Sequence, residues 1–553
     1  MALSGGPAEL RPVLGGRQAR VKTNQSAHKS QNTLPCNAVR YLTYSGNNIV
    51  NVDLPPGSEV LYPPPAIPGY PKSAYPEQVR RAFENPLGLA PLKSLVNGNS
   101  KVLIAFDDNC QPFPPTTRPD FRQIVLETLL PMLYSYGVEK KNIRLLCAVA
   151  LHRKMKRHEL EFMVGEKVMA EFYPHQLENF DAEAAEDMAA IGETDHGEVV
   201  EISRHAVEAG LVIYIDAVQI PLNGGHKSVG VGLAGYKTIA CHHSPQMTAD
   251  SPHVMQPHGS EMHNSIWRIG KVVDKHCKIM VLEFAMNGAT YPSHTAWLGK
   301  PAARCNRAER FVKDAAPLAM KLLPEMVRKG VLRSVPGAYQ PLAIHAGTVD
   351  DVHPITLAKL REQLTVEVPR QYDTMVFGLP DLSPYAMDAR VNPVLVVSDV
   401  LGYVFNWFYN KPLVKPGGTV IIVNPVTEVF HPEYHVAYRL FYDEVLAATQ
   451  NPFEMQSRYQ ERYAFDPHLR DCYRNRYAHH GFHPFTVWYW ATYPLKYLSQ
   501  VILVGPKDDR AARRLGVSWA PNMKEALAMG RKNGVDDVVA ATIPPFLYVN
   551  VAS

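Results

Sequence analysis

The 553-residue sequence has few cysteines and no long apolar run. Its cysteines are odd in number, scattered, and without a CxxC pair (Cys36, Cys110, Cys147, Cys241, Cys277, Cys305 and Cys472). This pattern favours a reducing cytosol over a disulfide framework. No stretch of about eighteen apolar residues is present, so we expect no transmembrane helix and a cytoplasmic protein.

The chain also lacks a strong excess of charge of either sign. A net charge of +4 is small for this length and argues against a nucleic-acid partner. The apolar content of 46% and charged content of 20% are ordinary for a soluble globular protein. The length allows two to four domains with sizeable cores. Composition therefore indicates a soluble protein without a membrane or nucleic-acid partner.

Two N-terminal segments have little capacity to form a core. Residues 1–35 are rich in Gly, Ser, Asn, Gln and basic residues, with Glu9 as the sole acid, which predicts a disordered tail. A targeting segment is the alternative, but no apolar stretch follows the basic residues. The proline-rich residues 54–72 predict an extended arm over the surface.

Strands and helices alternate through the first half of the chain. We expect strands at 101–106, 143–150, 212–215 and 278–288, and helices at 121–136, 156–170 and 306–330. This order is typical of a parallel sheet, in which ligands bind beyond the carboxyl ends of the strands. Asp108, His152 and the turn at 224–227 each follow a predicted strand. The sequence therefore predicts a site at this edge.

The alternation restarts after Gly347, with helices at 356–364, 393–405 and 523–533 and strands at 374–378, 419–423 and 501–504. We therefore predict an α/β protein with two α/β domains, mostly parallel sheets and a cofactor cleft between them. The N-terminal domain is expected at 36–340 and the C-terminal domain at 341–553. Residues 425–500, dense in aromatics and histidine, are interpreted as an insertion that packs on the second domain and is a candidate roof for the cleft.

One stretch, residues 212–243, combines the features of a binding site. An apolar β-branched strand leads into Gly224-Gly225, where the backbone can approach a ligand closely. Lys227 follows this turn. His243, the second residue of a His242-His243 pair, lies sixteen positions after Lys227. An amine and an imidazole near a glycine turn favour an anionic, carbonyl-containing or metallic ligand.

Several segments, taken in order, resemble the nickel-dependent lactate racemase family, whose members carry a nickel-pincer nucleotide. The segments in the first half are LHRKMKRHELEFMVGEKV, HQLENFDAEAAEDMAAIGETDHGEVVEISRHAVEAGLVIYI, NGGHKSVGVGLAGYKTI and the terminal His243. Asp107-Asp108 with the later Thr117-Arg118-Pro119 is similar to the family's DDxTRP motif. In the second half, YDTMVFGLPDLSP and VKPGGTVIIV are similar to its C-terminal domain.

The resemblance implies a role for each matching residue. Lys227, in a turn with Gly224, Gly225 and Ser228, matches the lysine that tethers the nickel-pincer nucleotide through a thioamide. His243 matches the nickel ligand, and a shift of one residue would exchange it with His242. His152 matches a general acid and base, with Asp108 as the acid that orients its ring. Arg118 matches the motif's arginine, and Gln111 is the rival counterpart.

Other positions depart from the family's pattern. Ala217 stands where the second catalytic histidine is expected, ten residues before the lysine. Val394, Leu395 and Ser398 replace the polar residues of a YQxxK motif. Gln219 with water, or a histidine from 425–500, are the candidates for the missing acid or base.

The resemblance as a whole implies a racemase or epimerase of a small-molecule 2-hydroxy acid, larger or less charged than lactate, that depends on cofactor-synthesis enzymes. Two alternatives remain. One is a protein that binds the cofactor without turnover. The other is a dinucleotide-dependent hydroxy-acid oxidoreductase, which the absence of a GxGxxG turn disfavours.

Overall fold

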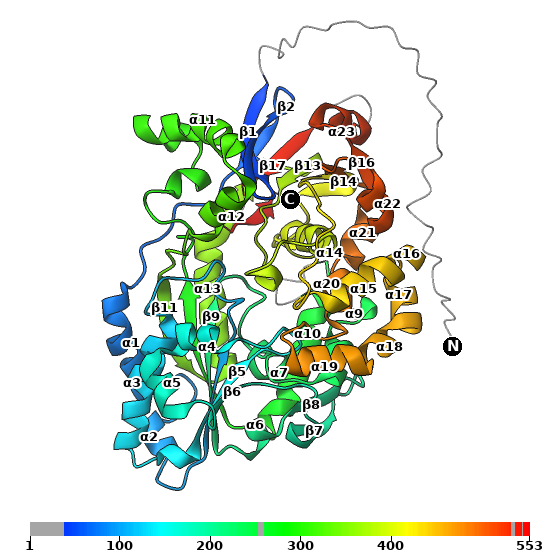
Figure 1. The fold of residues 1–553 in the computed structure, drawn as a ribbon. Helices are drawn as coiled ribbons and strands as arrows, with labels where there is room; N and C mark the ends of the chain where they lie inside the picture. The colour runs from blue at the N-terminus through cyan, green and yellow to red at the C-terminus, as the bar shows by residue number, and fades with distance from the viewer. Residues whose placement is uncertain (1–37, 253–258, 532–536, 543, 545, 553) are drawn as a thin grey trace, which may run out of the picture.

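Two six-stranded sheets organise the fold (Figure 1). The computed structural model describes residues 38–252, 259–531, 537–542, 544 and 546–552, so the tail predicted at 1–35 lies outside the described residues. Within these ranges, no helix is long and apolar enough to cross a membrane.

The first sheet carries the strands predicted in the first half of the chain. Its order is β11 (Pro341–Gly347), β10 (Ile279–Met286), β9 (Leu211–Val218), β4 (Val102–Asp107), β5 (Ile143–Ala148) and β6 (Leu177–Asn179). Neighbouring strands are parallel except β10 and β11. Every residue of β4 and β9 is buried. Because side chains alternate between the two faces of a strand, both faces of the sheet are covered there.

The second sheet is parallel throughout. Its order is β16 (Ser518–Ala520), β15 (Gln500–Val504), β14 (Val414–Val423), β13 (Tyr372–Gly378), β17 (Val538–Ala541) and β3 (Glu59–Leu61). The prediction of a mostly parallel α/β fold with two sheets is confirmed.

The N-terminal residues correct two expectations. Part of the proline-rich stretch is the edge strand β3, which pairs with β17. The hairpin of β1 (Val39–Ser45) and β2 (Asn48–Leu54) also contacts the second sheet, where the Tyr41 hydroxyl donates to the Ala541 carbonyl at 2.6 Å. Residues 39–61, predicted for the first domain, therefore pack with the second sheet, because the apolar face of the hairpin is buried there.

Three predicted helices are shorter or divided. The helix expected at 156–170 is two helices, α4 (Arg157–Val164) and α5 (Glu166–Phe172), because Gly165 between them has a φ of 82°. The helix expected at 306–330 is α11 (Arg307–Leu322) and α12 (Glu325–Arg333), separated by Leu323-Pro324. The helix expected at 393–405 is α14 (Pro393–Ser398), followed by wider and tighter turns over 399–406.

The aromatic residues 425–500 form the crossover between β14 and β15 and lie beside the second sheet (Figure 1). Their helices are α15 (Val436–Leu440), α16 (Leu446–Ala448), α17 (Pro452–Met455), α18 (Glu461–Ala464), α19 (Pro467–Asn475), α20 (His483–Tyr489) and α21 (Thr492–Tyr497). The segment is therefore part of the βαβ connection, and many of its aromatic rings are fully buried.

Candidate functional site

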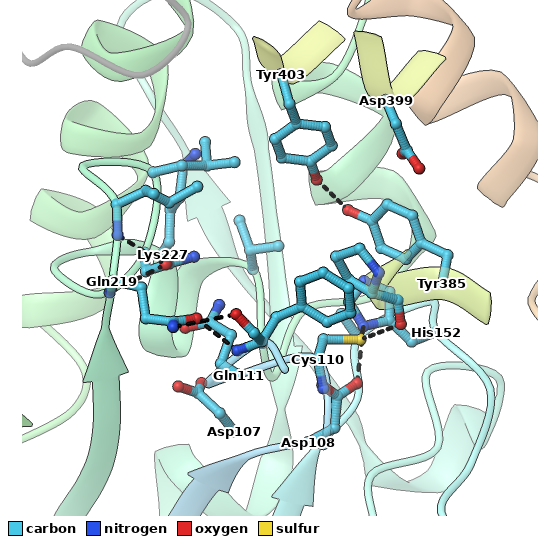
Figure 2. A pocket seen from close by; sticks show the side chains of 18 of the residues that line it. Asp107, Asp108, Cys110, Gln111, His152, Gln219, Lys227, Tyr385, Asp399 and Tyr403 are labelled. Carbon is cyan, nitrogen blue, oxygen red and sulfur yellow. Dashed lines mark hydrogen bonds and ion pairs between the residues drawn. The ribbon is translucent and has the colours of Figure 1, made fainter. Parts of the chain in front are cut away.

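A cavity of about 250 Å³ lies where the two halves of the chain meet, at the carboxyl ends of β4, β5 and β9 (Figure 2). The second half of the chain contributes residues from three places, namely the segment after β13, the turns at 399–407, and α20. Six of the site residues predicted from sequence line this cavity, namely Asp108, His152, Gly224, Lys227, Ser228 and His243. The residues that the sequence predicted at the strand ends therefore come together in a single cavity.

The turn before Lys227 needs its two glycines. Gly224 and Gly225 have φ values of 74° and 63°, a region that favours glycine. A Cβ on Gly224 would lie 2.8 Å from the Glu283 carboxylate, and one on Gly225 would lie 2.7 Å from the His353 ring. Gly225 itself does not line the cavity, but its N–H donates to Glu283 at 2.8 Å and fixes the turn. The turn thus positions Lys227 at the start of α7 (Lys227–Gly230).

Lys227 is a half-buried lysine without an ion pair to any carboxylate in the described part of the chain. Burial alone lowers the pKa of its amine to about 7. A large fraction of the amine is therefore unprotonated at neutral pH, which is the form that attacks an acyl or thioacyl group.

This lowered pKa predicts a pH-dependent stability of the protein without cofactor. The charged form is penalised in the folded state, so the penalty is complete below pH 7 and disappears as pH rises toward the unfolded pKa of 10.5. Lys227→Met should therefore be more stable than wild type at pH 7, and the difference should shrink by on the order of 3 kcal/mol by pH 10. Urea unfolding at both pH values measures it. Lys237→Met, at an exposed lysine, is the control, and equal pH slopes for both variants would contradict the prediction.

His243 follows α8 (Tyr236–His242) and presents one free ring nitrogen. Its Nδ1–H donates to the Ile239 carbonyl at 3.2 Å, and its ring stacks on Trp490 at 5.6 Å. Burial, and then the charge of Lys227, lower the pKa of His243 to about 3. The imidazole is therefore neutral with Nε2 available, which is the state that binds a metal ion. His242, the alternative ligand, is fully buried and does not line the cavity.

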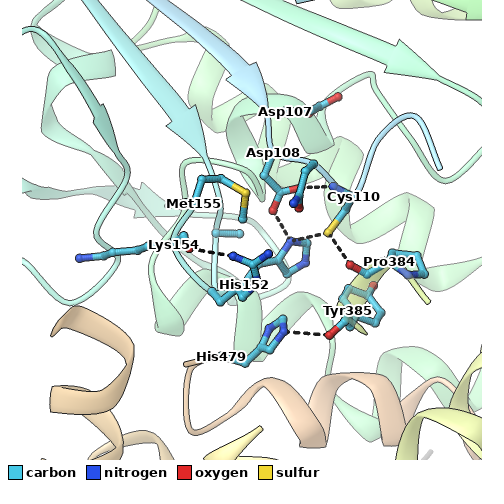
Figure 3. Close-up of polar contacts among 12 residues, drawn as sticks. Asp107, Asp108, Cys110, His152, Lys154, Met155, Pro384, Tyr385 and His479 are labelled. Atoms are coloured by element: carbon cyan, nitrogen blue, oxygen red, sulfur yellow. Dashed lines mark hydrogen bonds and ion pairs between the residues drawn. The ribbon is translucent and has the colours of Figure 1, made fainter. Parts of the chain in front are cut away.

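His152 and Asp108 form a hydrogen-bonded pair at the ends of two adjacent strands (Figure 3). His152 Nδ1 lies 2.8 Å from Asp108 Oδ2, while Asp108 Oδ1 accepts from the Cys110 N–H at 2.9 Å. Burial raises the pKa of Asp108, but the contacts with His152 and Cys110 together outweigh burial, and the net shift of the pKa is downward. The carboxylate thus orients the ring and leaves Nε2 for a substrate.

Cys110 is a neighbour of this pair that the sequence did not single out. Its Sγ lies 3.6 Å from His152 Nδ1 and donates to the Pro384 carbonyl at 3.1 Å. Burial raises the pKa of the thiol well above its ordinary value. It is therefore a neutral packing group beside the His152–Asp108 pair.

Arg118 does not lie where the sequence predicted it. Its side chain is exposed, with the guanidinium over the Phe162 ring at 5.4 Å, outside the cavity. The proline-rich loop after Asp108 carries it past the rim. Gln111, the rival counterpart, lines the cavity, and its buried Oε1 has no hydrogen-bond partner.

Two further carboxyls at strand ends belong to the site. Asp107 accepts from the Tyr214 hydroxyl at 3.2 Å, and Asp216 accepts from the Ser228 hydroxyl at 2.6 Å. Burial and then the Asp108 charge raise the pKa of Asp107 to about 6. Burial and then the Asp107 charge raise the pKa of Asp216 well above its ordinary value. Both residues stand at the ends of apolar strands, so the same strand-end signal could have found Asp216.

Ala217 is buried within β9 and brings no proton-transfer group to the site. Gln219, one candidate for that role, is committed to the backbone of Phe113, accepting from its N–H at 2.6 Å and donating to its carbonyl at 3.3 Å.

His483 of α20 lines the cavity. The centroid of its ring lies 5.2 Å from that of His152, and its Nδ1 lies 2.7 Å from the Tyr438 hydroxyl. Among the described histidines of 425–500, it is the one at the cavity.

One known protein family matches the first half of the chain. Residues 46–255 match the lactate racemase N-terminal domain family. The lactate racemase of Lactiplantibacillus plantarum is 31% identical over 196 residues, 34% of this chain and 42% of that protein. That of Thermoanaerobacterium thermosaccharolyticum is 29% identical over 171 residues, 30% of this chain and 37% of that protein. These matches span less than half the length of either relative.

The whole fold is similar to a solved structure. The lactate racemase apoprotein from Thermoanaerobacterium thermosaccharolyticum superposes with a TM-score of 0.58 at 17% identity, covering 92% of this chain and 100% of that one.

Fold and cavity together define an α/β protein that gathers a lysine, three imidazoles and several carboxyls in a cavity at the carboxyl ends of parallel strands. Over residues 46–255 the chain is similar to the lactate racemase N-terminal domain family, and its fold as a whole is similar to that of a lactate racemase apoprotein.

Proposed function

We propose that this chain is a racemase or epimerase that holds a nickel-pincer nucleotide and inverts the hydroxyl-bearing carbon of a 2-hydroxy acid or a neutral compound of the same shape. The observation that carries the proposal is the convergence of Lys227, His243 and the His152–Asp108 pair on one cavity. Similarity to lactate racemases supports the isomerase class.

The chain's own residues fit the nickel-pincer nucleotide. Lys227 supplies an unpaired amine, and a large fraction of this amine is unprotonated at neutral pH, as formation of a thioamide tether requires. His243 supplies a neutral Nε2, a donor that suits nickel. When bound, the cofactor supplies a centre that accepts and returns the hydrogen on the substrate's hydroxyl-bearing carbon.

His152 handles the hydroxyl proton in this proposal. With Nδ1 directed at Asp108, Nε2 is the atom that takes a proton from the substrate and gives it back. The ionised Asp108 stabilises the protonated ring. His483 is our candidate for the second acid or base. Its Nδ1 is hydrogen-bonded to the Tyr438 hydroxyl, and its ring lines the cavity beside His152.

Protein produced together with the cofactor-synthesis enzymes tests the proposal. We expect an added mass on Lys227, about one nickel per chain, and inversion of one member of a panel of chiral 2-hydroxy acids and their amides. The absence of both the mass and the nickel would refute the proposal. Mass and nickel without inversion on the panel would favour a cofactor-binding protein that lacks turnover.

A further inference from the structure

The cavity lacks a cation that is free to bind a carboxylate. Lys227 is the one lysine or arginine among the described residues that line it, whereas Asp107, Asp108, Asp216 and Asp399 contribute four carboxyls. A lysine whose amine is joined to a cofactor as a thioamide no longer carries a positive charge. A buried carboxylate without a partner costs several kcal/mol, so this cavity is a poor site for an anion.

The nearby guanidinium groups do not change this balance. Arg122 is buried and committed to Asp120 at 2.7 Å and to the carbonyls of Asp107 and Asp108. Arg153 is committed to Glu159 at 2.5 Å. Arg118 lies exposed outside the cavity. None of these three arginines lines the cavity.

Asp399 is the acid at the opposite side of the cavity from Lys227 (Figure 2). It follows α14 directly and stands next to Ser398, the residue that aligns with the lysine of the YQxxK motif. Its side chain is buried, Ser383 is its hydrogen-bonding partner, and its Oδ1 has none. A buried oxygen without a partner at a cavity wall is a position for a donor on a ligand.

Tyr403, which stands on the same turns as Asp399, belongs to a row of rings that reaches the acid–base pair. The Tyr403 hydroxyl is hydrogen-bonded to that of Tyr385, and the Tyr385 ring lies 5.2 Å from that of His152. Burial raises the pKa of Asp399 to about 7, so near neutral pH its carboxyl exists in both protonation states. It can therefore accept a hydrogen bond from a neutral group or donate one to it. Most of the remaining lining from the second half of the chain is apolar or aromatic, with His483 and Thr486 as its polar members; the apolar and aromatic residues include Phe377, Leu379, Leu382, Val404, Trp407 and Phe546.

We propose that the cavity selects an uncharged hydroxyl-bearing substrate with an apolar body over a carboxylate, and that Asp399 determines this preference by hydrogen bonding to the substrate's second polar group. The inference rests on the proposed function for the reacting carbon, but the preference is a property of binding. It can therefore be measured separately from turnover, on protein whose Lys227 carries the added mass.

Matched ligands separate charge from shape. Mandelamide and mandelate differ only in carboxamide against carboxylate, and so do lactamide and lactate. Binding to the protein purified from the co-producing strain, measured by calorimetry and by tryptophan fluorescence from Trp407 and Trp490, should favour each amide over its acid at least tenfold at pH 7.5. Asp399→Asn, which keeps the shape, should reduce that ratio about tenfold.

Ser398→Ala is the neighbouring control, and it should leave the ratio unchanged. Circular dichroism and thermal unfolding verify that both variants fold, and Asp399→Ser is a second variant should Asp399→Asn unfold. Tighter binding of the acids by wild type, an unchanged ratio in the Asp399 variants, or no binding of either amide at millimolar concentration would each overturn the inference. Failure of the proposed function appears instead as missing nickel and missing mass on Lys227.

Discussion

Replacing Lys227 by alanine should abolish nickel retention in protein produced alongside the cofactor-synthesis enzymes. The cofactor is attached to the protein through one thioamide, so removal of the Lys227 amine removes this covalent bond. The His243 imidazole is then the one remaining protein ligand in the proposed site. Intact-mass spectrometry should show the unmodified chain, and metal analysis should show nickel near background. Lys227→Arg tests whether charge is sufficient, since a guanidinium keeps the charge but does not form the thioamide. It should behave like alanine.

His243→Ala separates attachment from metal binding. Its Nε2 is the proposed ligand, so this variant should retain the added mass on Lys227 while its nickel content falls at least tenfold. His242→Ala is the matched control, because this adjacent ring is buried but does not line the cavity. Retention of nickel in Lys227→Ala would show that Lys227 is not the tether. Loss of nickel in His242→Ala but not in His243→Ala would show that His242 is the ligand.

The features that sequence predicted well are those set by local patterns. Apolar β-branched runs specify buried parallel strands, and polar residues directly after them come together because the carboxyl ends of parallel strands share an edge. Asp108, His152 and Lys227 followed from this rule and line one cavity. Gly224 and Gly225 were recognisable because the turn requires positive φ angles.

The features that sequence missed depend on contacts between distant segments. Tyr403 and Asp399 stand in a region expected to be regular helix, and only the irregular turns after α14 direct them to the cavity. Arg118 was misplaced because the path of a proline-rich loop cannot be read from its length. The packing of the hairpin of residues 39–54 on the second sheet could not be predicted locally, because its partner, Ala541, lies 500 positions along the chain from Tyr41.

Replacing His152 by alanine should reduce inversion of the wild type's substrate by about 10²–10⁴-fold, the usual contribution of a general acid or base. Mass on Lys227 and nickel content should stay unchanged, since His152 is paired with Asp108 and not with the proposed nickel ligand. Asp108→Asn should cause a smaller loss, because the ring remains but its orientation and the stabilisation of its charged form are weakened.

The exposed pair of His196 and Asp195 offers the matched control for this prediction, because it repeats the same contact at 3.0 Å outside the cavity. His196→Ala should retain full activity and full nickel. Loss of nickel in His152→Ala would mean that the roles of His152 and His243 are exchanged. Retention of inversion in His152→Ala would instead move the proton transfer to another group, with His483 next to be tested, because its ring stands 5.2 Å from that of His152 at the same wall of the cavity.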